Sequence, residues 1–129
     1  MRKDSAGMAR LALLDSVTET TAAHADALVV TGSHGGASVV RYARAVPARL
    51  FVFNDAGIGK ERAGVRALDL LDADGIAAAA VAHDSARIGE ARDAWAHGRI
   101  SAVNAAAARL GLRVGMLLRE ALAPLIDST

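Results

Sequence analysis

The 129-residue chain contains no cysteine, which excludes disulfide bonds, cysteine nucleophiles and thiolate metal sites. Aromatic residues make up only 3% of it and no basic run exceeds two residues, so a nucleic-acid-binding surface is not expected. No apolar stretch approaches the roughly 20 residues of a membrane span, and the one near residues 11–14 is too short for a signal peptide. With a net charge of only +1, the chain is expected to be soluble and cytoplasmic, without nucleic-acid or membrane partners.

Hydrophobic residues make up 53% of the chain, and alanine supplies much of this fraction. A chain of this length predicts one α/β domain over residues 1–129, with an ordered core at about residues 8–126. Because alanine side chains are small, we expect a core in which helices and strands approach one another closely.

Apolar runs and polar turns alternate along the chain. Strands are predicted at residues 8–14, 27–31, 50–53 and 76–82. Helices are predicted at residues 36–46, 60–74, 89–96, 101–110 and 116–123. This order is typical of a three-layer α/β sandwich with a short, mainly parallel sheet of about four strands and helices on both faces.

Polar loops follow three of the predicted strands, at residues 32–36, 54–60 and 83–89. The C-terminal ends of parallel strands meet at one edge of a sheet, which is where α/β proteins bind ligands. We therefore expect the three loops to form one site.

The first loop places Gly32, Ser33, Gly35 and Gly36 around His34. A glycine-rich turn that opens a helix can present its backbone N–H groups to a phosphate or carboxylate. The alternative is a tight turn capped by Ser33, and the spacing is not that of the dinucleotide fingerprint. Capping does not require an imidazole, so His34 is expected to act as a general acid or base, or to donate a hydrogen bond to a bound carboxylate.

The second loop resembles a phosphate-binding P-loop only superficially. Asn54 stands where that motif has its first glycine, and Glu61 stands where it has serine or threonine, so the motif for ATP or GTP hydrolysis is absent. Asp55 is either a base or orienting carboxylate, or, like Asn54, a turn-holding side chain. Lys60 at a helix start opposes the helix dipole and needs a partner, either Glu61, Asp55 or a bound anion.

The third loop groups His83, Asp84, Ser85 and Arg87 after an apolar strand. Ser85 or Asp84 could simply cap a helix. Arg87 in a first helical turn would again oppose the dipole and reach an acidic group or an anion. Asn104 is a weak helix former within an alanine-rich helix, where it either faces solvent or points towards the site.

Two further kinds of site are compatible with these residues. His34, Asp55, His83 and Asp84 could hold a divalent metal, although no metal-ligand spacing is present and we expect no metal or other cofactor. A Ser-His-Asp hydrolase could use Ser33 or Ser85 with Asp55, although the G-x-S-x-G turn is absent.

Five runs of the sequence carry a resemblance: GSHGG at 32–36, FNDAGIG at 53–59, SARIG at 85–89, Val103-Asn104 and Gly115-Met116. Together they resemble a family of small uncharacterised bacterial α/β proteins, some with two copies in tandem. The resemblance covers about residues 13–122 and implies that the three loops belong to one site and that the chain forms a homo-oligomer. It implies no activity.

The leading hypothesis is an enzyme of the hydrolase or proton-transfer (isomerase or lyase) type, without a redox cofactor, acting on a small polar, anionic metabolite. The alternatives are a non-catalytic binding or regulatory domain and a subunit of a larger enzyme. The expected catalytic residues are His34, Asp55, His83 and Ser85. The expected ligand-binding residues are Gly32, Ser33, Gly35, Gly36, Asn54, Gly57, Lys60, Asp84, Arg87 and Asn104.

Overall fold

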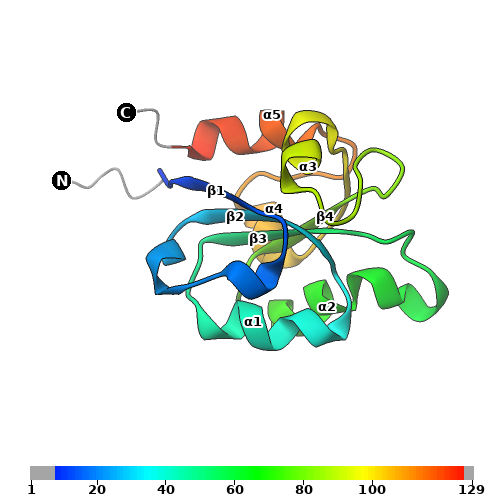
Figure 1. Cartoon of the computed structure of the whole chain (residues 1–129), viewed down its shortest axis with the longest axis horizontal. Coiled ribbons are helices and arrows are strands. Elements are labelled where there is room, and N and C mark those ends of the chain that lie inside the picture. Colours follow the sequence, from blue (N-terminus) through cyan, green and yellow to red (C-terminus); the bar gives the residue numbers. More distant parts are fainter. Residues whose placement is uncertain (1–7, 127–129) are drawn as a thin grey trace.

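A five-stranded sheet forms the centre of the computed structural model, which describes residues 8–126 (Figure 1). The strands lie in chain order: β1 (Leu11–Leu14), β2 (Leu28–His34), β3 (Leu50–Asn54), β4 (Ala78–Val81) and β5 (Ile100–Val103). The first four strands are parallel, and β5 is antiparallel to β4. The predicted α/β sandwich is therefore confirmed, with five strands rather than four.

Helices cover both faces of the sheet (Figure 1). On one face lie α1 (Val40–Ala45) and α2 (Arg66–Ala73), and on the other lie α3 (Ala91–His97) and α5 (Leu118–Leu122). The remaining helical segments are η2 (Val17–Glu19), η3 (Ala22–His24), η4 (Ala37–Val39), η5 (Lys60–Val65), α4 (Ala105–Arg109) and η6 (Ala123–Leu125). Within residues 8–126, no helix combines the length and apolar character that a membrane crossing requires.

Two hydrophobic clusters, one on each face, bury alternate residues of the central strands. In β3, Phe51 and Phe53 face α1 and α2, with their rings stacked at 6.2 Å between centroids, whereas Leu50 and Val52 face α3 and α5. All four residues of β4 are buried, three of them alanines. The small side chains of β4 thus let its neighbours approach closely, as the composition predicts.

The predicted helix over residues 101–110 is confirmed only at α4, residues 105–109. Residues 100–103 form β5 instead, because Ile100 and Ala102 alternate with the less buried Ser101 and Val103 as a half-buried strand requires. Asn104 then caps α4, so Ser101 is not a helix cap.

The predicted helix over residues 60–74 is regular only from Arg66 onward. Glu61 and Arg62 have φ angles of 55° and 60°, in the left-handed region, which a regular helix cannot accommodate. Lys60 therefore does not lie at the start of an α-helix, and the dipole argument for its partner does not apply. The predicted end of this helix near residue 74 is confirmed, because α2 ends at Ala73 and Gly75 follows with a φ of +75°.

Candidate functional site

The three predicted loops meet at the C-terminal edge of the parallel strands. His34, the last residue of β2, is paired with Asn54, the last residue of β3. The next residue, Asp55, donates its backbone N–H to Val81 O at the end of β4 over 2.8 Å. Antiparallel β5 begins at the same edge and brings Ser101 there. The edge therefore collects side chains from four successive strands.

Asp55 is the buried centre of this edge, with 5% of its side chain exposed. Its Oδ1 accepts the backbone N–H groups of Gly57 at 2.7 Å and His83 at 3.0 Å. Its Oδ2 accepts the hydroxyl of Ser101 at 2.7 Å. Ser101 is not among the expected site residues, because the alanine-rich stretch around it predicts a helix and not the short strand β5 that carries this serine.

The pKa of Asp55 reflects this environment. Burial alone would raise it, but the hydrogen bond from Ser101, the two backbone N–H groups and the charge of His83 together outweigh that effect. The net result is a pKa below the ordinary value of 3.8. Asp55 is consequently a carboxylate at neutral pH.

The imidazole of His83 lies against this carboxylate. Its Nδ1 is 3.4 Å from Asp55 Oδ1, while 59% of the His83 side chain is exposed. The ring also lies close to Gly57, where a Cβ would come within 3.7 Å of Cε1. A neutral His83 ring with its proton on Nδ1, facing the carboxylate, leaves Nε2 free on the solvent side. A carboxylate that faces one imidazole nitrogen can orient the ring so that the other nitrogen accepts a proton.

His34 has the opposite arrangement, because its ring contacts the backbone of Gly36 and not the carboxylate of Asp55. Its Nδ1 accepts the backbone N–H of Gly36 at 2.9 Å, which leaves the proton of a neutral ring on Nε2. The side chain is exposed. His34 therefore presents a donor to the solvent side of the edge, whereas His83 presents an acceptor.

The glycine-rich loop does not form the expected open cradle for an anion. Gly32 N–H bonds to Asp15 O, Gly35 N–H bonds to Asn54 O, and Gly36 N–H bonds to the His34 ring. These backbone donors are already used within the protein. These three glycine N–H groups are therefore not free to bind an anion.

Close packing explains two of these glycines. A Cβ at Gly32 would come within 2.4 Å of Glu90 N, and a Cβ at Gly35 within 2.8 Å of Gly64 O.

Ser33 does not cap a helix, since its hydroxyl oxygen accepts the backbone N–H of Val17 at 2.9 Å.

Asn54 links the second loop to the third. Its side-chain amide donates to Ala86 O at 2.9 Å, and its carbonyl oxygen accepts the N–H of Ala56 at 2.8 Å. The residue is 2% exposed. Of the two interpretations of Asn54, the structure therefore favours the turn-holding one.

Ser85 is also engaged within the protein, whereas its neighbours are open to solvent. Its hydroxyl donates to Ala82 O at 2.7 Å and accepts the N–H of Arg99 at 3.0 Å. Asp84 and Arg87 are exposed. Because α3 begins only at Ala91, Arg87 is not in a first helical turn, and the predicted conflict with a helix dipole does not arise.

Asn104 lies away from the site, at the opposite edge of the sheet. Its carbonyl oxygen accepts the N–H groups of Ala78, at the start of β4, and Ala107. Its amide donates to Leu68 O and Ile76 O. The expectation that Asn104 faces either solvent or the site is therefore wrong, because β5 runs antiparallel and carries this residue to the far edge.

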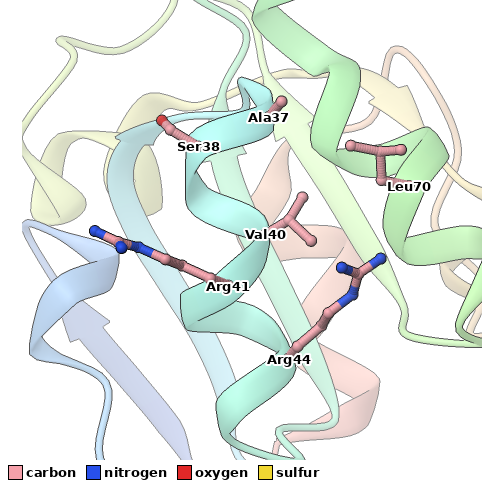
Figure 2. Close-up of a pocket in the computed structure, with 6 residues that line it drawn as sticks. All are labelled: Ala37, Ser38, Val40, Arg41, Arg44 and Leu70. Atoms are coloured by element: carbon pink, nitrogen blue, oxygen red, sulfur yellow. The ribbon is translucent and has the colours of Figure 1, made fainter.

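Ala37, shortly after β2, contributes to the walls of two hollows. One, of about 490 Å³, is lined by Ala37, Lys60, Glu61, Ala63 and Arg66. The other, of about 480 Å³, lies between α1 and α2, where Val40 and Leu70 approach each other and Arg44 extends along the groove (Figure 2). Arg44 is bound there to Asp74, with 2.6 Å between Nε and Oδ2.

The described part of the chain contains no set of side chains that matches the metal site considered above. No group of three or more histidine, aspartate or glutamate side chains within residues 8–126 is arranged to hold a metal ion. His83 and Asp55 form a pair, and His34 is engaged with Gly36 instead.

Comparison with known proteins yields no match: no family model, curated protein or solved structure corresponds to this chain. The resemblance based on the loop motifs therefore stays a prediction. The geometry of the edge carries the functional argument by itself.

Proposed function

We propose that this protein is an enzyme that catalyses proton transfer on a small polar, anionic metabolite, with His83 as the general base. One observation carries the proposal: an exposed imidazole lies 3.4 Å from a buried carboxylate that Ser101 and two backbone N–H groups keep ionised. In ligand-free structures the distance between two catalytic side chains is often longer than an ideal hydrogen bond, and it shortens when substrate binds.

The two histidines supply complementary chemistry. His83 Nε2 takes a proton from the substrate, and the charge of Asp55 stabilises the imidazolium that forms. His34 Nε2–H can then donate a hydrogen bond to the oxygen on which negative charge develops. His34 ends β2 and His83 follows β4, and these strands are separated by two strand spacings, about 10 Å, so we expect both rings to reach one small substrate.

Proton transfer fits the site better than hydrolysis by a serine nucleophile. Such a nucleophile must hydrogen-bond to the histidine base, and among residues 8–126 no serine hydroxyl hydrogen-bonds to His83. Ser33 and Ser85 bond elsewhere, and Ser101 bonds to Asp55. Isomerisation or elimination is therefore the favoured reaction class, with hydrolysis by an activated water as the second.

Deuterium exchange offers a test that does not require the natural substrate. An enzyme that removes a proton from carbon exchanges it for solvent deuterium, which ¹H NMR detects in D₂O. We expect at least one member of a panel of small carboxylates and phosphate esters to exchange with the wild-type protein. His83→Gln should lower the exchange rate by about 10²- to 10⁴-fold.

The control is His97→Gln, which replaces an exposed histidine on α3 and should exchange at the wild-type rate. Equal exchange by wild type and His83→Gln contradicts the proposal. Binding of a panel member without any exchange supports the alternative of a non-catalytic binding domain.

A further inference from the structure

The hollow lined by Lys60 and Arg66 borders the proposed catalytic edge. Its volume is about 490 Å³, and Ala37 and Ala63 form part of its wall. The ring of His34 lies beside the same backbone, because a Cβ at Gly36 would come within 2.9 Å of His34 Nδ1 and 3.5 Å of Ala63 O. A group bound in this hollow is therefore next to one of the two proposed catalytic histidines.

The charges around the hollow are unbalanced. Two nearby arginines have carboxylate partners, since Arg44 is 2.6 Å from Asp74 and Arg62 is 3.7 Å from Asp69. Lys60 has no ion pair with any carboxylate of residues 8–126, and neither has Arg66. Of the three partners considered for Lys60, neither Glu61 nor Asp55 forms an ion pair with it among these residues, although Glu61 also lines the hollow.

A strained segment carries Lys60. Four non-glycine residues near it have positive φ angles: Ala56 (51°), Ile58 (62°), Glu61 (55°) and Arg62 (60°). Left-handed backbone is costly for such residues, above all for the β-branched Ile58, and clusters of this strain are typical of ligand-binding segments. Lys60 lies within this strained segment. It lines the same hollow as Arg66, which lies at the start of α2.

The chemistry of the hollow favours a phosphate group. The backbone N–H groups of Arg62, Gly64 and Ala67 already bond to protein carbonyls, so the charges that the hollow offers an anion are those of the Lys60 and Arg66 side chains. A guanidinium fork and an ammonium on separate elements match a dianion with several oxygens better than a planar monoanion. We propose that this hollow binds the phosphate group of the substrate, which makes the substrate a small phosphate monoester; this inference rests on the proposed function.

Titration of the full chain with inorganic phosphate, followed by ¹H–¹⁵N NMR, tests the site. We expect saturable shifts of the amides of Ala37, Lys60, Ala63 and Arg66. Lys60→Ala and Arg66→Ala should each raise the dissociation constant at least tenfold. The control, Arg109→Ala, removes an exposed arginine of α4 and should bind phosphate like the wild type.

Acetate and chloride at equal ionic strength identify the ligand class. Phosphate should bind at least tenfold more tightly than acetate at pH 8. Equal affinity for acetate, or phosphate binding that neither Lys60→Ala nor Arg66→Ala weakens, overturns the inference.

The two proposals fail in different ways. His83→Gln should bind phosphate as tightly as the wild type, because this residue does not line the hollow. Phosphate binding without deuterium exchange on any member of the panel supports the anion site and contradicts the proposed reaction. Deuterium exchange on carboxylates alone, with no phosphate binding, supports the proposed reaction and contradicts the phosphate inference.

Discussion

Two buried polar side chains lie at opposite ends of β4, and they are satisfied in different ways. Asn104, at the start of the strand, makes four hydrogen bonds of 2.8–3.2 Å to protein groups, which use both atoms of its amide fully. Asp55, beyond the end of the strand, accepts three protein hydrogen bonds and also faces the exposed ring of His83.

This difference matches a structural role for Asn104 and the functional role proposed for Asp55. The partners of Asn104 come from α2, β4, α4 and the turn before β4, so this amide joins secondary-structure elements and reaches no solvent-exposed group. Asp55 uses its bonds to hold a charge against an exposed imidazole. Burial is common to both residues, so the proposed role of Asp55 depends on its exposed partner, His83.

The largest expected effect on stability comes from Asn104→Ala. It removes four hydrogen bonds and leaves the buried N–H groups of Ala78 and Ala107 without their acceptor, which should lower the free energy of unfolding by about 3–5 kcal/mol. Asn104→Ser retains a capping oxygen and should recover part of this loss. Urea denaturation measures both, and a loss below about 1 kcal/mol for Asn104→Ala would contradict the structural role.

Asp55→Asn should have a smaller effect that depends on pH. Because folding lowers the pKa of Asp55, its contribution to stability is fully present above the unfolded-state value near 3.8 and is lost as pH falls through the folded-state value. We expect the variant to be less stable than the wild type by about 2 kcal/mol at pH 7. Urea denaturation from pH 7 to pH 2.5 should show this gap closing below about pH 4, and a gap that stays constant is the contrary result.

Ser101→Ala should cost about 1–2 kcal/mol, because it removes one hydrogen bond to a charged group. It should also raise the pKa of Asp55 towards its ordinary value, which an NMR titration of the carboxyl carbon detects. Ser101→Thr keeps the hydroxyl and should restore the wild-type titration. An unchanged Asp55 titration in Ser101→Ala would show that this serine does not act on the carboxylate.

The smallest expected effect is an increase in stability. Ala56 has a φ of 51°, so Ala56→Gly should relieve strain and stabilise the protein by about 0.5–1 kcal/mol. Ala63 lies in the same region without a positive φ, and Ala63→Gly should destabilise by a similar amount. Thermal denaturation compares the pair, and shifts of the same sign would argue against strain at Ala56.

Much of the site edge can be predicted from the sequence, because buried parallel strands read as continuous apolar runs and polar loops follow them. Residues 28–30 and 50–53 show this plainly, and they place His34 and Asp55 on neighbouring strands. The sequence does not predict strand β5, because its four residues are followed closely by the alanine-rich helix α4. Its antiparallel direction, which separates Ser101 from Asn104, is likewise invisible in the pattern.

The partners within the site depend on tertiary contacts. Asp55 faces His83, whereas Nδ1 of His34 accepts the backbone N–H of Gly36. Residue spacing in the sequence does not predict either contact. The left-handed Glu61 and Arg62 are equally unpredictable, because non-glycine residues adopt this conformation only when surrounding contacts impose it.

The most direct test of the Asp55–His83 pair is the tautomer of each histidine, measured by long-range ¹H–¹⁵N NMR at alkaline pH, where imidazole rings are neutral. His83 should carry its proton on Nδ1, facing Asp55, and Asp55→Ala should abolish this preference. His24 and His34 serve as internal references, because their Nδ1 atoms accept backbone N–H groups at 2.9 Å and predict the Nε2–H tautomer. An Nε2–H tautomer for His83 would contradict the assignment of His83 as a base oriented by Asp55.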